Sequence, residues 1–166
     1  MAIAGDCKSP DFGLRWFESI YSHLFIYFIT GDSTRMKDEL NELLDYFEKL
    51  GQRAIACKHW QWKIGMSTSS NQRVIRIDSD GYVLGYQSYI NYLTQVTQDT
   101  IPDLSDPATL GCLLAVVRDA HRDPRMFVEA YSFLRDKWRC MGVSFSSEWV
   151  GPSEAEALVA ALEAAP

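Results

Sequence analysis

The sequence predicts an α+β fold, in which an N-terminal helical hairpin packs on small antiparallel strands and is followed by a helix, a β-hairpin and a last helix. Two observations predict this class. Apolar residues recur every three or four positions near both ends of the chain, which is the period of an amphipathic helix. Between residues 53 and 87 the period shortens towards two, which is the period of a strand.

The composition is that of one globular domain. The chain has 166 residues, of which 47% are hydrophobic and 23% charged, and this length suits a single core. We expect one domain in three parts: a helical hairpin (1–52), a β-rich middle (53–105) and a helix-hairpin-helix part (106–166). The start lacks the features of a secretory signal, and residues 14–29 are too often interrupted by charge to cross a membrane. A cytoplasmic location and no membrane contact are therefore expected.

Two helices are predicted before residue 51. Ser9 and the proline after it are typical of a helix start, and apolar residues then recur at four-residue spacing up to Phe28. Gly31 ends this first helix. A second helix is expected to begin near Ser33 or Thr34 and to end before Gly51, with leucines on one face and charged residues on the other.

Short strand-like runs follow the second helix. They are "RAIAC" (53–57), "WQWKIG" (60–65), "RVIRI" (73–77) and "YVLGY" (82–86). The turn "DSDG" at 78–81 joins the last two runs, so residues 73–87 are predicted to form a β-hairpin. Residues 88–105 fit either a short helix or an irregular crossover.

The C-terminal part begins with a third predicted helix. It starts at Asp106, whose side chain precedes a proline, and ends around His121. Residues 125–135 fit a strand of a second hairpin or a helix nearly equally well. Ser153 and Glu156 form a capping box, which predicts the last helix.

Several segments resemble a group of small proteins encoded in bacteriophages and prophages. These segments are "WQWKIGM", "RVIRIDSDG", "PDLSDPATLGCLLAVVRDA" and the closing "EAEALVAALEAAP", and together they span about residues 59–166. The resemblance implies expression in the cytoplasm of a bacterial host. The group has no established activity, so the resemblance implies this setting and no mechanism. Small phage-encoded accessory proteins often act on host proteins, and from this context we expect a protein that binds a host protein and inhibits a defence system in the manner of an anti-CRISPR protein.

Aromatic side chains supply the candidate binding residues. In a strand, Trp60 and Trp62 would share one face, where they would either anchor the core or form an exposed ledge that stacks a base or grips a partner. Aromatic residues make up 13% of the chain, and tyrosine and tryptophan are favoured at interfaces. The candidate partner- or ligand-binding residues are Trp60, Trp62, Lys63, Tyr82, Tyr86 and Tyr89.

Other site chemistries have weaker support. Cys57 and His59 are a weak candidate metal pair, because the paired spacing of zinc sites is missing. Cys112 lies near a helix start, where the helix dipole would lower its pKa, but no base is placed beside it. The carboxylates near turns fit local capping, and no phosphate-binding loop is present.

The sequence thus predicts a non-catalytic binding protein that needs no cofactor and binds a host protein. The net charge of −6, from 16 basic and 22 acidic side chains, disfavours direct binding to duplex nucleic acid. A small-molecule or nucleotide-binding module with an aromatic ledge is the alternative function, and a thiol- or metal-dependent enzyme is the third. A homodimer is a further hypothesis.

Overall fold

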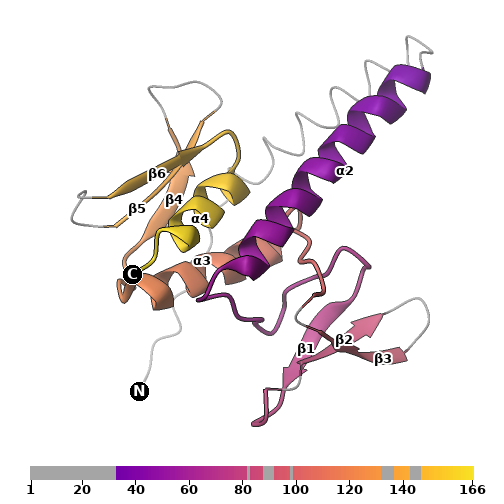
Figure 1. Ribbon diagram of the computed structural model, residues 1–166, viewed down its shortest axis with the longest axis horizontal. Coiled ribbons are helices and arrows are strands. Elements are labelled where there is room, and N and C mark those ends of the chain that lie inside the picture. Colours follow the sequence, from indigo (N-terminus) through magenta and orange to yellow (C-terminus); the bar gives the residue numbers. More distant parts are fainter. Residues whose placement is uncertain (1–32, 82, 88–91, 98, 132–136, 143–146) are drawn as a thin grey trace, which may run out of the picture. The chain divides into compact units, whose positions relative to one another are not determined.

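The computed structural model describes residues 33–81, 83–87, 92–97, 99–131, 137–142 and 147–166 (Figure 1). The chain divides into two compact units, residues 1–43 and 44–166. The first helix of the expected hairpin falls outside the described residues.

The predicted α+β class is confirmed for the part of the chain that is described. Its helices are α2 (Ser33–Ala56), α3 (Pro107–His121) and α4 (Glu154–Glu163). The strands form two antiparallel sheets of three strands each. One sheet contains β1 (Arg73–Ile77), β2 (Val83–Gln87) and β3 (Tyr92–Val96), and the other contains β4 (Phe127–Ala130), β5 (Trp138–Met141) and β6 (Glu148–Gly151), both in that order.

Helix α2 is longer than the sequence predicts. The expected end before Gly51 is wrong, and the "RAIAC" run is helical as far as Ala56. Gly51 allows Ile101 to pack closely against the helix, since a Cβ at that position would lie 2.6 Å from the Cγ2 of Ile101. Leu50 and Ala54 on the same helix are buried in the core, so the apolar face continues through the glycine.

Polar contacts join the C-terminal half of α2 to α4. The Tyr46 hydroxyl lies 2.9 Å from the Ser153 hydroxyl and donates to Glu156 at 3.2 Å. Arg53 donates two hydrogen bonds to Glu163, both of 2.9 Å, and one to Glu156. A bidentate guanidinium–carboxylate pair fixes orientation as well as distance, so this network sets how the helices lie together.

The first predicted hairpin is confirmed, whereas one predicted strand is not. Strands β1 and β2 pair antiparallel, and Gly81 in their turn has a φ of 79°. The "WQWKIG" segment, predicted as a strand, belongs to no strand. Its backbone reverses instead, because Gly65 has a φ of 99° and the Met66 N–H donates to the Lys63 carbonyl at 3.2 Å.

Strands form part of both remaining open segments. Neither a helix nor an irregular crossover describes residues 92–96, which form β3 and pair with β2, whereas the described residues 99–105 belong to no helix and to none of the six strands. Residues 127–130 are strand β4, which decides between the two alternatives for that region. The expected second hairpin carries an additional strand, β6, which pairs with β5 and was not predicted.

The N-caps predicted for the last two helices are present, but the capping box is only half formed, because the Glu156 carboxylate accepts from Tyr46 and Arg53 and is not seen to accept from the Ser153 N–H. The Ser153 side chain accepts from the Glu156 N–H at the start of α4, and Asp106 caps α3. Helix α4 packs on α3 and on β4, β5 and β6 (Figure 1). The contact with β6 is close, since a Cβ on Gly151 would lie 2.6 Å from the Cβ of Glu156.

A single hydrophobic cluster holds these elements together. Its fully buried side chains come from α2, β1, α3, α4 and the intervening loops, and the largest are Leu50, Met66, Leu104, Leu113, Met126, Leu158 and Leu162. Within the described residues, no helix combines the length and the apolar character that spanning a membrane requires.

Candidate functional site

The tryptophan pair lies in the core rather than on an open surface. Trp62 is only 8% exposed and belongs to the core cluster, and Trp60 is half-buried and packs against that cluster. Their ring centroids are 5.5 Å apart at an interplanar angle of 79°, which is an edge-to-face contact. This geometry fits the core-anchor interpretation, since neither ring offers a fully open face for stacking.

The neighbours of the tryptophans have structural partners. The Lys63 ammonium pairs with Asp119 at 2.8 Å. The Cys57 thiol donates to the Arg53 carbonyl, and a ring nitrogen of His59 lies 2.7 Å from the Pro166 carbonyl oxygen. In the part of the chain that the structure describes, no three or more His, Cys, Asp or Glu side chains are grouped to hold a metal ion.

The described thiols are poorly suited to nucleophilic attack. Burial raises the pKa of Cys112, and the charge of Asp106 raises it further. The lowering expected from the helix dipole is therefore wrong, because loss of hydration and a nearby carboxylate outweigh it. Burial also raises the pKa of Cys57, and it raises that of Cys140 to about 11.

One face of the β1–β2–β3 sheet gathers side chains that the core does not use. Antiparallel partners point to the same side of a sheet, and the register aligns Arg73, Tyr86 and Leu93 in one row and Arg76, Leu84 and Gln95 in the next. A bulge in β1 leaves Ile75 beside Arg76, so that both stand opposite Leu84. We call these seven residues the outer sheet face.

The opposite face of the same sheet is largely buried, although Ile77 at the end of β1 is 37% exposed. Val74, Val83 and Val96 lie on it and belong to the core cluster. The pleat therefore separates an inner valine face from an outer face whose residues lie outside the buried core, although Arg73 on it donates to the Gly65 carbonyl at 3.0 Å. On the outer face Ile75 is 47% and Leu93 is 51% exposed.

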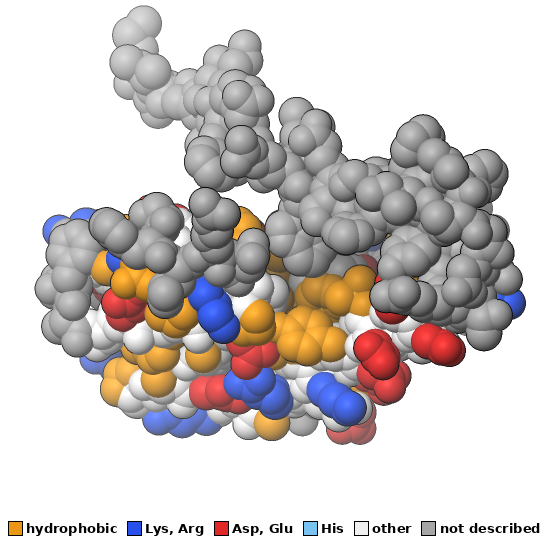
Figure 2. All heavy atoms as spheres, turned by 90° about the horizontal axis from the view of Figure 1, so that it is seen from above, with side chains coloured by type: hydrophobic (Ala, Val, Ile, Leu, Met, Phe, Trp, Pro, Cys, Tyr) orange, Lys and Arg blue, Asp and Glu red, His pale blue; other side chains and the backbone are white. Residues whose placement is uncertain are grey.

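The charge of the outer sheet face differs from that of the chain. The 15 residues of β1, β2 and β3 include two charged side chains, Arg73 and Arg76, and both lie on this face. Each has an acidic neighbour, since Arg76 pairs with Asp78 and Arg73 lies 3.7 Å from Asp106. Figure 2 shows that hydrophobic side chains are interspersed with charges of both signs on the side of the molecule that it draws.

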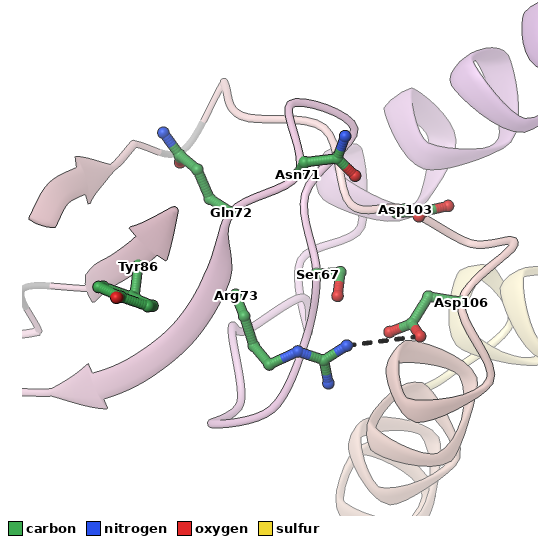
Figure 3. A pocket seen from close by; sticks show the side chains of 7 residues that line it. All are labelled: Ser67, Asn71, Gln72, Arg73, Tyr86, Asp103 and Asp106. Carbon is green, nitrogen blue, oxygen red and sulfur yellow. Dashed lines mark ion pairs between the residues drawn. The ribbon is translucent and has the colours of Figure 1, made fainter. Parts of the chain in front are cut away.

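A polar pocket adjoins the outer sheet face. It encloses about 510 Å³ and is lined by Ser67, Asn71, Gln72, Arg73, Tyr86, Asp103 and Asp106. Figure 3 shows Arg73 extending from β1 towards Asp106 at the start of α3. Arg73 and Tyr86 thus belong both to the pocket and to the outer sheet face.

A hydrogen-bond network fixes one wall of this pocket. Asp106 accepts from the Thr109 N–H at 3.1 Å and from its hydroxyl at 2.8 Å, and that hydroxyl accepts from the Ser67 N–H at 2.8 Å. Burial by itself raises the pKa of Asp106. Hydrogen bonds from Thr109 and Ser67, with the charge of Arg73, outweigh it and hold that pKa below its ordinary value. Asp106 is therefore ionised at neutral pH and already accepts hydrogen bonds from Thr109.

Of the candidate residues from the sequence, Tyr86 is the one that reaches the outer sheet face. Trp60, Trp62 and Lys63 lie elsewhere, while Tyr82 and Tyr89 fall outside the described residues. The arginines and aliphatic residues of this face were not predicted. Their alternation along the hairpin was a usable signal, but the bulge that turns Arg76 outward follows from no sequence pattern.

Comparison of this chain with protein-family models, with curated proteins and with solved structures gives no match.

Proposed function

We propose that the protein acts without catalysis, by binding a partner protein through the outer sheet face. One observation carries the proposal: in an acidic chain, this face combines exposed aliphatic side chains, a tyrosine and the sheet's two arginines. Tyrosine and arginine are enriched at interface centres, and exposed aliphatic side chains supply apolar area for burial.

The partner that fits this face has an acidic rim around an apolar centre. Arg73 and Arg76 would meet the acidic groups, and Ile75 and Leu93 would meet the apolar ones. Arg76 is 68% exposed beside Asp78. An exposed ion pair of this kind contributes little to stability, so replacing Asp78 with a carboxylate of the partner would cost little free energy. Complementary charge also raises the association rate.

Single-stranded nucleic acid fits the face less well. Such surfaces stack successive bases on several aromatic rings and follow the phosphates with unpaired cations. Among the seven residues of the outer sheet face there is one aromatic ring, Tyr86, and both arginines have carboxylates nearby. The aliphatic side chains favour protein.

The resemblance to phage-encoded proteins indicates where to look for the partner. We propose a protein of the bacterial host, with components of defence systems as the first group to test. In this proposal the chain acts in the host cytoplasm, and occupying the partner's surface is sufficient for inhibition.

The test begins with capture of host proteins on the tagged full chain, followed by affinity measurement with the purified partner. Ile75→Asp and Arg76→Glu should each weaken binding at least about tenfold, which corresponds to about 1.4 kcal/mol. Val150→Asp is the matched control, because Val150 is an exposed strand residue of the other sheet. Equal affinity of all three variants and the wild type would refute the proposal.

The polar pocket favours a second candidate function, the binding of a small polar molecule. Its amide, hydroxyl, guanidinium and carboxylate groups beside the Tyr86 ring suit a nucleoside-like ligand. Thermal melting with a panel of nucleosides and nucleotides tests this candidate. A shift that Gln72→Ala abolishes would support it, and the absence of any shift would remove it.

A further inference from the structure

Strand β3 differs from the other strands at the edges of the two described sheets. The edges are β1, β3, β4 and β6. Strand β1 contains two arginines and a bulge, β4 contains Glu129 and β6 contains Glu148. Strand β3, with the sequence YLTQV, contains no charge, no proline and no bulge in its register with β2.

Charges, prolines and bulges are the features by which proteins keep edge strands from pairing with other chains. The other edge of the same sheet also has a partner, since Val74 of β1 exchanges backbone hydrogen bonds with Gly65 and Met66. Among the described residues, no backbone hydrogen bond is seen on the side of β3 that faces away from β2. The exposed Leu93 adds apolar surface beside that edge.

We infer that two copies of this chain join through β3, antiparallel, into one continuous sheet of six strands. A second copy fits this edge because the chain carries a net charge of −6, so two copies repel each other except where the surface is neutral or basic. Strand β3 is neutral, and the charges on its sheet are the two arginines of β1.

The register follows from the two faces of the sheet. The two copies would be related by a two-fold axis perpendicular to the sheet. If this axis passes through a residue of β3, side chains of the inner face stand opposite side chains of the inner face. If it passed between two residues, Val96 of the inner face would stand opposite an outer-face residue of the other copy. An axis through Thr94 pairs all five residues of β3. Leu93 of each copy then stands opposite Gln95 of the other.

This arrangement leaves the outer sheet face open and doubles it. It does not depend on the proposed binding function. The substitutions that test it, at Leu93 and Gln95, lie on β3 within the outer sheet face and are read out by the mass of the protein alone, whereas the substitutions that test partner binding lie on β1. A five-residue strand is a short contact, so the dimer should dissociate on dilution.

Light scattering after size exclusion, over a range of concentrations of the full chain, should show a change from the mass of one chain to twice that mass. Leu93→Lys with Gln95→Lys places two lysine pairs opposite each other and should weaken the dimer at least about tenfold. Leu93→Lys with Gln95→Glu is the matched control: it has the same lysine, but opposite charges face each other, so the dimer should remain.

A protein of single-chain mass at every concentration would overturn the inference. So would an unchanged dimer of the double-lysine variant, or a folded but monomeric lysine–glutamate variant. If the double-lysine variant does not fold, amide hydrogen exchange of the wild type decides. Protection of residues 92–96 that grows with concentration supports pairing through β3, and protection independent of concentration contradicts it.

Discussion

Trp62 shows how one side chain in a loop can belong to the core. It is buried beside Trp60 in a segment that forms no strand. We expect Trp62→Ala to lower the free energy of unfolding by about 3–5 kcal/mol, because removing a buried indole loses apolar burial and leaves a cavity. Urea denaturation followed by circular dichroism measures the loss.

Ile64 provides the control in the same segment, since it is 62% exposed. Ile64→Ala should change the free energy of unfolding by no more than about 0.5 kcal/mol. A loss below about 1 kcal/mol for Trp62→Ala would show that the tryptophan does not anchor the core.

The Cys140 thiol makes the stability depend on pH in the alkaline range. Burial raises its pKa to about 11, whereas in the unfolded chain it titrates near its ordinary value of about 8.5. Between these values the unfolded state has lost a proton that the folded state keeps. The free energy of unfolding therefore falls as the pH rises, by about 2 kcal/mol between about pH 8 and pH 10.

Urea denaturation at the two pH values tests this, with Cys140→Ala as the reference. The variant is less stable at pH 8 because it lacks a buried side chain, but it should lose less stability on going to pH 10. Equal losses for the two proteins would mean that Cys140 does not titrate between them.

At the level of the element, Gly51 decides how α2 continues. Replacing glycine with alanine inside a helix usually stabilises by up to about 1 kcal/mol. Here a Cβ would lie 2.6 Å from Ile101 and 3.1 Å from the Pro102 carbonyl oxygen. We expect Gly51→Ala to destabilise instead, by about 1–3 kcal/mol, because the added methyl group overpacks the contact.

Gln52→Ala tests the intrinsic preference of the same turn without the contact, since Gln52 is exposed in α2. The melting temperature of Gly51→Ala should fall, whereas that of Gln52→Ala should rise or stay unchanged. A rise in melting temperature for Gly51→Ala would show that the helix can move away from residues 101–102.

The elements that were predicted correctly are those specified by neighbouring residues. The caps at Asp106 and Ser153 act over three residues, and the turn before Gly81 joins strands next to each other in sequence. The elements that were missed depend on distant contacts. Helix α2 continues past Gly51, where Ile101 lies against it, and β6 forms because it pairs with β5.

At the level of the whole molecule, composition predicts less about the site than about the fold. An acidic chain rich in aromatic residues predicts binding, but it does not tell which rings are buried. By sequence, Trp62 stands out more than Tyr86 as a candidate binding residue, but Trp62 lies in the core, whereas Tyr86 lies on the outer sheet face. Only the register of three strands brings Arg73 and Leu93 beside Tyr86.

The contact between Trp60 and Trp62 also has an optical consequence. Two indole rings held 5.5 Å apart at 79° couple their electronic transitions, and a fixed chiral arrangement of this kind produces a pair of circular dichroism bands of opposite sign. The core of this protein therefore carries its own spectroscopic reporter. This pair of bands should vanish when the two rings separate, even while the circular dichroism of the helices is retained.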